Sequence, residues 1–108
     1  MSNTKFTPGP YMVERIKKGE YYVKGEGSRL CLIDWLEHHD TEARANADLF
    51  AAAPDLYYAL SNCADMLTEA AKQFRKRGDT GHATLCLMHA GKANKSLAKA
   101  RGEKTDEK

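Results

Sequence analysis

Three residues in the C-terminal third have the types and spacing of metal ligands. His82, Cys86 and His89 stand at positions i, i+4 and i+7, so on a helix they would share one face. Zinc accepts imidazole and thiolate ligands, but its site needs a fourth ligand or a water and supporting hydrogen bonds. Cys86 also falls in an apolar line of the same segment. We therefore interpret it as a core thiol between surface imidazoles, and we expect neither a metal nor a cofactor.

The sequence carries no arrangement typical of an enzyme. A nucleophilic serine or cysteine needs a positioned base, and neither a G-x-S-x-G elbow nor a glycine-rich phosphate loop is present. The acidic residues between positions 34 and 69 include no pair set apart for acid–base chemistry. We therefore predict a protein that is not an enzyme.

Basic side chains in the C-terminal third form two groups that are candidates for binding a ligand or partner. They are Arg75, Lys76, Arg77, Lys92, Lys95 and Lys99. Three interpretations are open. The groups could be a solvated face matched to the helix dipole, a surface for phosphate, nucleotide or nucleic acid, or a contact with the acidic segment of another protomer. Few aromatic residues accompany them, so sequence-specific nucleic-acid recognition is not favoured.

Tyr57 and Tyr58 complete the candidate binding residues. Two adjacent residues of a helix cannot both face the same apolar line. At least one of these tyrosines therefore turns toward the sheet, a pocket or a partner, where its apolar ring and polar hydroxyl both suit an interface.

The charge is distributed unevenly along the 108-residue chain, although 17 basic and 15 acidic residues give a net charge of only +2. Residues 1–33 carry +3, residues 34–69 carry −7, residues 71–101 carry +7 and residues 102–108 carry −1. Such asymmetry concerns partners more than the fold. Because a chain of this size has little spare core, we expect a homo-oligomer, a dimer or higher, with complementary surfaces.

The composition also bounds the compartment. No apolar run approaches the roughly 20 residues that cross a bilayer, and the first residues lack the apolar stretch of a secretory signal. The odd number of widely spaced cysteines, Cys31, Cys63 and Cys86, fits buried thiols in a reducing compartment better than a disulfide framework. We expect a cytoplasmic protein with no membrane partner.

The first third of the chain predicts a three-stranded antiparallel sheet over about residues 11–36. The two prolines of Thr7–Pro10 exclude a helix at that point. Three runs rich in β-forming residues follow, separated by turns at Lys18–Gly19 and Gly25–Ser28.

The rest of the chain predicts three helices, over about residues 41–53, 54–77 and 80–101. Asp40 or Thr41 is the expected N-cap of the first helix, and Asp79 or Thr80 that of the third. Pro54 ends the first helix and suits the first turn of the second.

Two apolar lines with alternating spacings of three and four residues predict that the second and third helices pack as an antiparallel αα-hairpin. The bulky line consists of Leu56, Leu60, Cys63, Leu67, Ala70 and Phe74. The small line consists of Ala83, Cys86, Ala90, Ala93, Leu97 and Ala100. The predicted fold is therefore α+β, in a single domain of residues 1–101, with residues 102–108 as a disordered tail.

Two stretches resemble a family of small phage and prophage proteins. They are T-P-G-P-Y-x-V at residues 7–13 and A-N-A-D-L-F-A-A-A-P-D-L-Y-Y-A-L at residues 45–60. The family pattern runs T-P-G-P-W-x-V, a few strands, and then A-N-A-R-L-I-A-A-A-P-x-L-L-x-A-L. Here Tyr11, Asp48, Phe50 and Tyr57 depart from the usual residues, so any surface role of those positions differs.

The resemblance implies a phage accessory protein that acts inside a bacterial cell. By analogy of architecture and genome context, we expect it to bind and inhibit or sequester a host component in counter-defence. The partner would be a host defence protein, blocked by an anti-CRISPR-like inhibitor, or a nucleotide second messenger, held by a sponge. The alternative is a small nucleic-acid-binding accessory factor that uses the basic helical hairpin.

Overall fold

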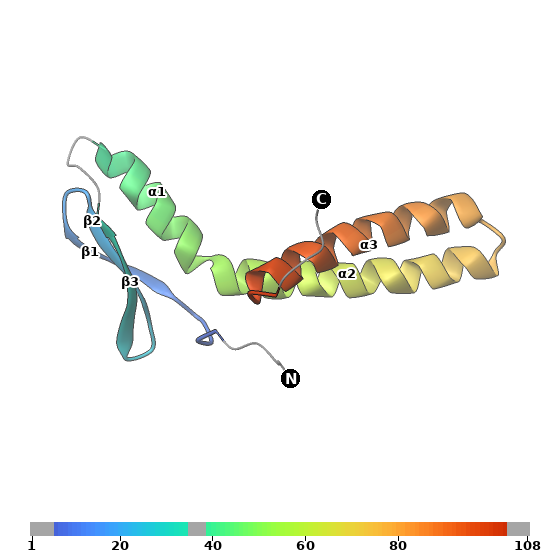
Figure 1. Ribbon diagram of the computed structural model, residues 1–108, viewed down its shortest axis with the longest axis horizontal. Helices are drawn as coiled ribbons and strands as arrows, with labels where there is room; N and C mark the ends of the chain where they lie inside the picture. Colours follow the sequence, from blue (N-terminus) through green and yellow to red (C-terminus); the bar gives the residue numbers. More distant parts are fainter. Residues whose placement is uncertain (1–5, 35–38, 104–108) are drawn as a thin grey trace. The chain divides into compact units, whose positions relative to one another are not determined.

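A computed structural model describes residues 6–34 and 39–103 of the chain. Its elements are β1 (Met12–Lys17), β2 (Glu20–Gly25), β3 (Ser28–Asp34), α1 (Asp40–Ala51), α2 (Ala53–Lys76) and α3 (Thr80–Ala100). The predicted α+β class is confirmed, with a three-stranded antiparallel sheet, one short helix and two long helices that pack together (Figure 1). The chain divides into two compact units, one of which is Phe6–Leu56 and the other of which begins at Tyr57. A single domain over residues 1–101 stays a prediction.

The sheet has the order β1-β2-β3, with antiparallel pairing on both sides of β2. Both connections are tight turns that contain a glycine with positive φ, Gly19 at 83° and Gly27 at 85°. This left-handed region favours glycine, because a Cβ atom is strained there. The predicted turns are therefore confirmed, while the predicted strand end at residues 35–36 lies outside the described residues.

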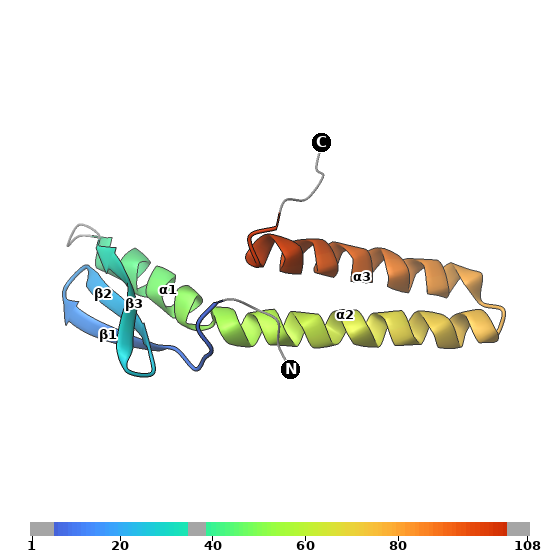
Figure 2. The same cartoon turned by 60° about the horizontal axis from the view of Figure 1, so that its bottom comes forward.

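The core of the first unit lies between the sheet and α1. Tyr21 and Val23 of β2 are almost completely buried, and with Ile33 of β3 they pack against Ala43 and Ala47 of α1. Helix α1 contacts all three strands and lies across one face of the sheet (Figures 1 and 2). The small alanine side chains let the helix approach the sheet closely, so the aromatic and branched residues of β2 fill the space between them.

The start of α1 differs from the predicted cap. The N-cap residue is His39, without a side-chain cap hydrogen bond, and Asp40 is the first residue of the helix. The Asp40 carboxylate instead accepts hydrogen bonds from the Gly19 backbone N–H at 2.5 Å and from the Tyr21 hydroxyl at 2.8 Å. These bonds lower the pKa of Asp40, first through Gly19 and then through Tyr21. Asp40 therefore ties α1 to the β1–β2 turn.

Helices α2 and α3 run antiparallel beside each other in both views (Figures 1 and 2). Gly78, at φ 82°, ends α2, and the backbone N–H groups of Gly78 and Asp79 donate to the carbonyls of Arg75 and Phe74. This is a Schellman arrangement. The Asp79 carboxylate then accepts from the His82 backbone N–H at 3.1 Å, so the predicted Asp79 cap of α3 is confirmed.

The predicted contact line of α2 was wrong, because a different side of the helix lies at the hairpin interior. The buried residues of α2 that face the hairpin interior are Ala64 and Ala71, each 1% exposed. The bulky residues of the predicted line lie beside them, half-buried at Leu60 and Leu67 and exposed at Leu56. Apolar residues cover a wide arc of α2, so their spacing alone does not decide which of them lies at the centre.

The predicted contact line of α3 is confirmed except at its end. The buried residues are Ala83, Ala90, Ala93 and Leu97, and Cys86 is half-buried. Ala100, the last residue of α3, is exposed. The hairpin interior is therefore built almost entirely from alanine, with Leu97 as its one large buried side chain among the described residues.

The prediction of buried thiols was wrong for two of the cysteines. Cys31 and Cys63 are exposed. Cys31 lies on β3, an edge strand, and Cys63 lies beside the buried line of α2 rather than in it. Burial in this fold follows the position of each residue, not the hydrophobicity of its thiol.

The last residues that the structure describes, Gly102 and Glu103, follow directly after the end of α3 and Arg101. Gly102 has φ 80°, and the Glu103 backbone N–H donates to the carbonyl of Ala98 at 3.0 Å. The Glu103 carboxylate pairs with Arg101 at 2.9 Å. The disordered tail of residues 102–108 stays a prediction, and residues 104–108 lie outside the described residues.

Candidate functional site

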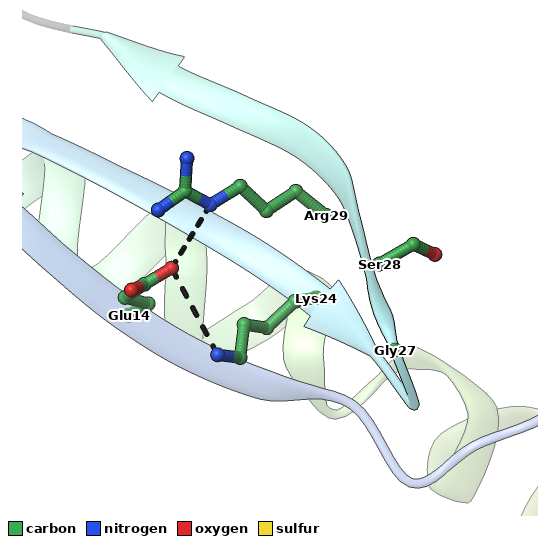
Figure 3. A pocket seen from close by; sticks show the side chains of 5 residues that line it. All are labelled: Glu14, Lys24, Gly27, Ser28 and Arg29. Atoms are coloured by element: carbon green, nitrogen blue, oxygen red, sulfur yellow. Dashed lines mark hydrogen bonds and ion pairs between the residues drawn. The ribbon is translucent and has the colours of Figure 1, made fainter.

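A hollow of about 450 Å³ lies on the face of the sheet away from α1, near the β2–β3 turn. Its charged lining residues come from all three strands, Glu14 from β1, Lys24 from β2 and Arg29 from β3 (Figure 3). The Glu14 carboxylate accepts from Arg29 Nε at 3.1 Å and lies 3.9 Å from Lys24 Nζ. The Arg29 guanidinium also stacks 4.2 Å from the centre of the Tyr22 ring.

The electrostatics of this hollow are those of a shared ion pair. The hydrogen bond from Arg29 lowers the pKa of Glu14, and the same bond raises the pKa of Arg29. One carboxylate therefore serves two cations, and the group joins the three strands on a solvent-exposed face. Sequence reasoning missed this cluster, because its members lie up to 15 positions apart and only strand register brings them together.

The first predicted basic group lies at the tip of the hairpin. Arg75 and Lys76 end α2, and Arg77 begins the turn that leads to α3. The Arg77 guanidinium lies 5.5 Å from the centre of the Phe74 ring, which in turn stacks on the His82 ring at 5.2 Å. The tip therefore presents exposed cations around a small aromatic stack.

The second predicted basic group lies on the side of α3 away from α2. Lys92, Lys95 and Lys99 are exposed, and none makes an ion pair with another residue that the structure describes. Two exposed apolar residues continue the same line toward the start of the helix, Leu85 at 46% and Met88 at 50% exposure. We name these five residues, which recur at spacings of three and four, the outer stripe of α3.

The two predicted tyrosines lie at the opposite end of the hairpin from its tip. Tyr57 is half-buried and accepts a hydrogen bond from Arg101 Nη1 at 2.8 Å, so the start of α2 is linked to the end of α3. The Tyr58 ring meets the Tyr57 ring edge to face, with centres 5.2 Å apart. The expectation that one tyrosine turns away from the apolar line is confirmed, since Tyr58 is 37% exposed.

The structure therefore does not bring the predicted binding residues into one site. With a rise of about 1.5 Å per residue, Lys92 lies roughly 18 Å along α3 from Thr80 at the hairpin tip. The tip cations, the outer stripe and the tyrosine pair are three separate surfaces of one hairpin. Leu85 and Met88, which sequence reasoning missed, could have been found by extending the lysine spacing backwards along the helix.

The three candidate metal ligands, His82, Cys86 and His89, lie in ordinary structural surroundings. The His82 ring is within 2.7 Å of the Asp79 carboxylate and stacks on Phe74, while Cys86 is half-buried against α2 and His89 is exposed. Within residues 6–34 and 39–103, no three histidine, cysteine or acidic side chains are grouped to hold a metal ion. Over the same ranges, no helix is both long and apolar enough to cross a membrane.

Comparison with known proteins gave a match to a protein family. Searches of curated proteins and of solved structures found none. The model of a protein family described as Salmonella phage P22 protein Y8K6 matches residues 1–104, which is nearly the whole chain. The chain therefore belongs to the phage protein family of Salmonella phage P22 protein Y8K6.

Proposed function

We propose that this phage-encoded accessory protein is not an enzyme, and that it binds and inhibits a host protein in counter-defence. Membership of a phage protein family supports a function that benefits the phage. The observation that carries the choice of a protein target is the outer stripe of α3, where exposed apolar and cationic side chains share one line.

The two halves of the outer stripe suit a protein surface better than a nucleic acid. Burial of Leu85 and Met88 in an apolar cleft of a partner protein would be favourable in free energy, and a phosphate backbone offers no such cleft. The three lysines beside them would steer the protein toward an acidic surface and fix its orientation. An acidic host protein with an apolar cleft satisfies both halves.

The test compares a phage that carries this gene with the same phage lacking it, on hosts with and without defined defence systems. We expect the deletion to lower plating only on a defended host, and the wild-type gene to restore it. The double variant Lys92→Glu/Lys95→Glu should fail to restore plating. The matched control is Lys17→Glu/Lys18→Glu, which makes the same charge change on exposed residues of the first unit and should restore it. Equal plating of deletion and wild type on every host, or full rescue by the α3 variant, would contradict the proposal.

A second candidate function is nucleic-acid binding by the basic hairpin, favoured by the six exposed cations of the tip and the outer stripe. Each phosphate that a cation neutralises steepens the fall of affinity with salt, by about 0.9 in the logarithmic slope for duplex DNA. Binding to duplex and single-stranded DNA and to RNA, measured at about 50 and 200 mM salt, decides this candidate. No binding at the lower salt eliminates it.

The alternative of a nucleotide sponge makes a separate prediction. Protein purified from infected cells would carry a nucleotide that native mass spectrometry detects as an added mass. The Lys92→Glu/Lys95→Glu variant would lose that mass if the outer stripe holds the nucleotide, because its phosphates need the cations.

A further inference from the structure

Helix α2 carries a second apolar line that α3 does not cover. It runs beside the buried alanines and consists of Leu56, Ala59, Cys63, Met66 and Ala70, which we name the α2 stripe. Leu56 is 53% exposed and Met66 is 71% exposed, while Ala59 and Cys63 are also exposed. The stripe spans about 21 Å of helix at 1.5 Å per residue.

The spacing of the α2 stripe is that of a helix-pairing surface. Its members recur at alternating intervals of three and four residues, which keeps one line facing a partner helix over several turns. The three smaller side chains allow a close approach of backbones, and Leu56 and Met66 project as knobs between them. Scattered apolar residues on a surface have no such order.

The charges of α2 select the partner and its direction. Asp55 lies in the first turn of α2, with Asp65 and Glu69 toward its middle, whereas Arg75 and Lys76 lie in the last turn. Two parallel copies of α2 would place like charges side by side. Two antiparallel copies would place the acidic first turn of each beside the basic last turn of the other, and would also oppose their helix dipoles.

We propose that the α2 stripes of two copies of this chain pack against each other in antiparallel orientation, so that two α2–α3 hairpins form a four-helix assembly. A self-complementary surface of this kind closes as a twofold dimer. The stripe from Leu56 to Ala70 is centred on Cys63, which therefore lies closest to the twofold axis, with Met66 about one turn away. This proposal does not depend on the proposed function, because the outer stripe lies on the other helix.

The first test is sedimentation equilibrium of the full chain at tens of micromolar, at about 0.15 and 1 M NaCl. We expect wild type to be a dimer at both salt concentrations, since screening removes the charge contribution but not the apolar contact. Met66→Lys should be a monomer with unchanged helix content by circular dichroism. The matched control, Met88→Lys, introduces the same change at an exposed methionine of the outer stripe and should remain a dimer. A monomeric wild type, or a dimeric Met66→Lys variant, would overturn the proposal.

A second measurement keeps the proposal testable if Met66→Lys does not fold. Two chains that each carry a single thiol are compared. In the first, Cys31 and Cys86 are replaced by serine to leave native Cys63; in the second, all three native cysteines are replaced by serine and Met88→Cys is added. Oxidised glutathione should convert the chain with Cys63 into a covalent dimer and leave the chain with Met88→Cys largely monomeric. Equal cross-linking of the two variants would refute the antiparallel pairing. The Met88→Lys variant separates the two proposals, since it should lose plating rescue while keeping the dimer.

Discussion

Replacing Leu97 with alanine should destabilise the hairpin more than any other single truncation in α3. Leu97 is 4% exposed, and the other buried residues of the hairpin interior that the structure describes are alanines. A buried Leu→Ala change costs about 2–5 kcal/mol, because transfer free energy is lost and a cavity remains. Alanines have no side-chain freedom with which to fill that cavity, so we expect about 3 kcal/mol or more.

The assay is thermal and urea unfolding followed by circular dichroism, at one fixed protein concentration. A loss of about 3 kcal/mol lowers the midpoint of thermal unfolding by roughly 12–24 °C in a unit of this size. The control is Leu85→Ala, the same change in the same helix at a side chain that is 46% exposed, and it should cost less than about 1 kcal/mol. Equal losses at Leu97 and Leu85 would refute the assignment of the hairpin interior.

Three further perturbations follow from the structure. Asp40→Asn should make the free energy of unfolding depend less on pH in the acid range. Because the pKa of Asp40 is lowered in the folded protein, its carboxylate stabilises the fold above the ordinary carboxyl pKa, and this contribution is lost as pH falls through the lowered value. Urea unfolding midpoints measured between about pH 6 and 2 will show the difference. Ile33→Ala should cost about 2–4 kcal/mol in urea unfolding, and Leu32→Ala on the same strand much less, because Ile33 is 8% and Leu32 44% exposed. Gly91→Ala should stabilise the fold by about 0.5–1 kcal/mol and raise the thermal midpoint, since Gly91 lies inside α3 and an added Cβ would meet open space. Gly78→Ala should lower the midpoint, because Gly78 has φ 82°.

The sequence predicted the elements well where local signals agreed. The glycine turns, the proline at the start of α2 and the Asp79 cap each act within a few residues, and the structure places all of them as expected. The contact line of α3 was also predictable, because its small residues form one narrow stripe.

Which side of α2 faces the hairpin interior could not be predicted from its sequence in the same way. Apolar residues cover a wide arc of this helix, and their hydrophobicity alone favours the bulky line through Leu60 and Leu67. The buried residues at the centre are instead Ala64 and Ala71. The bulky residues flank that centre, and part of the arc is left as the α2 stripe.

Polar contacts between residues far apart in the chain could not be predicted from the sequence either. Asp40 fits an N-cap by its type and position, but the turn at Gly19 and the hydroxyl of Tyr21 offer its carboxylate two partners from elsewhere in the chain. The group around Glu14 depends in the same way on strand register. Among the candidate binding residues, the exposure of the basic set was predictable, whereas its separation into distinct surfaces required the structure.

Because the first compact unit ends at Leu56, it can form while the ribosome is still adding the hairpin. Synthesis proceeds at about 5–20 residues per second, and helical hairpins with local contacts close within microseconds to milliseconds. The pairing of α2 with α3 costs the least loop entropy beside Gly78, where Phe74 and His82 are in contact. It then proceeds along both helices toward Tyr57 and Arg101. The nascent chain therefore completes its α3 surface seconds after the N-terminal sheet has been synthesised, when that sheet no longer offers unfolded strands for mispairing.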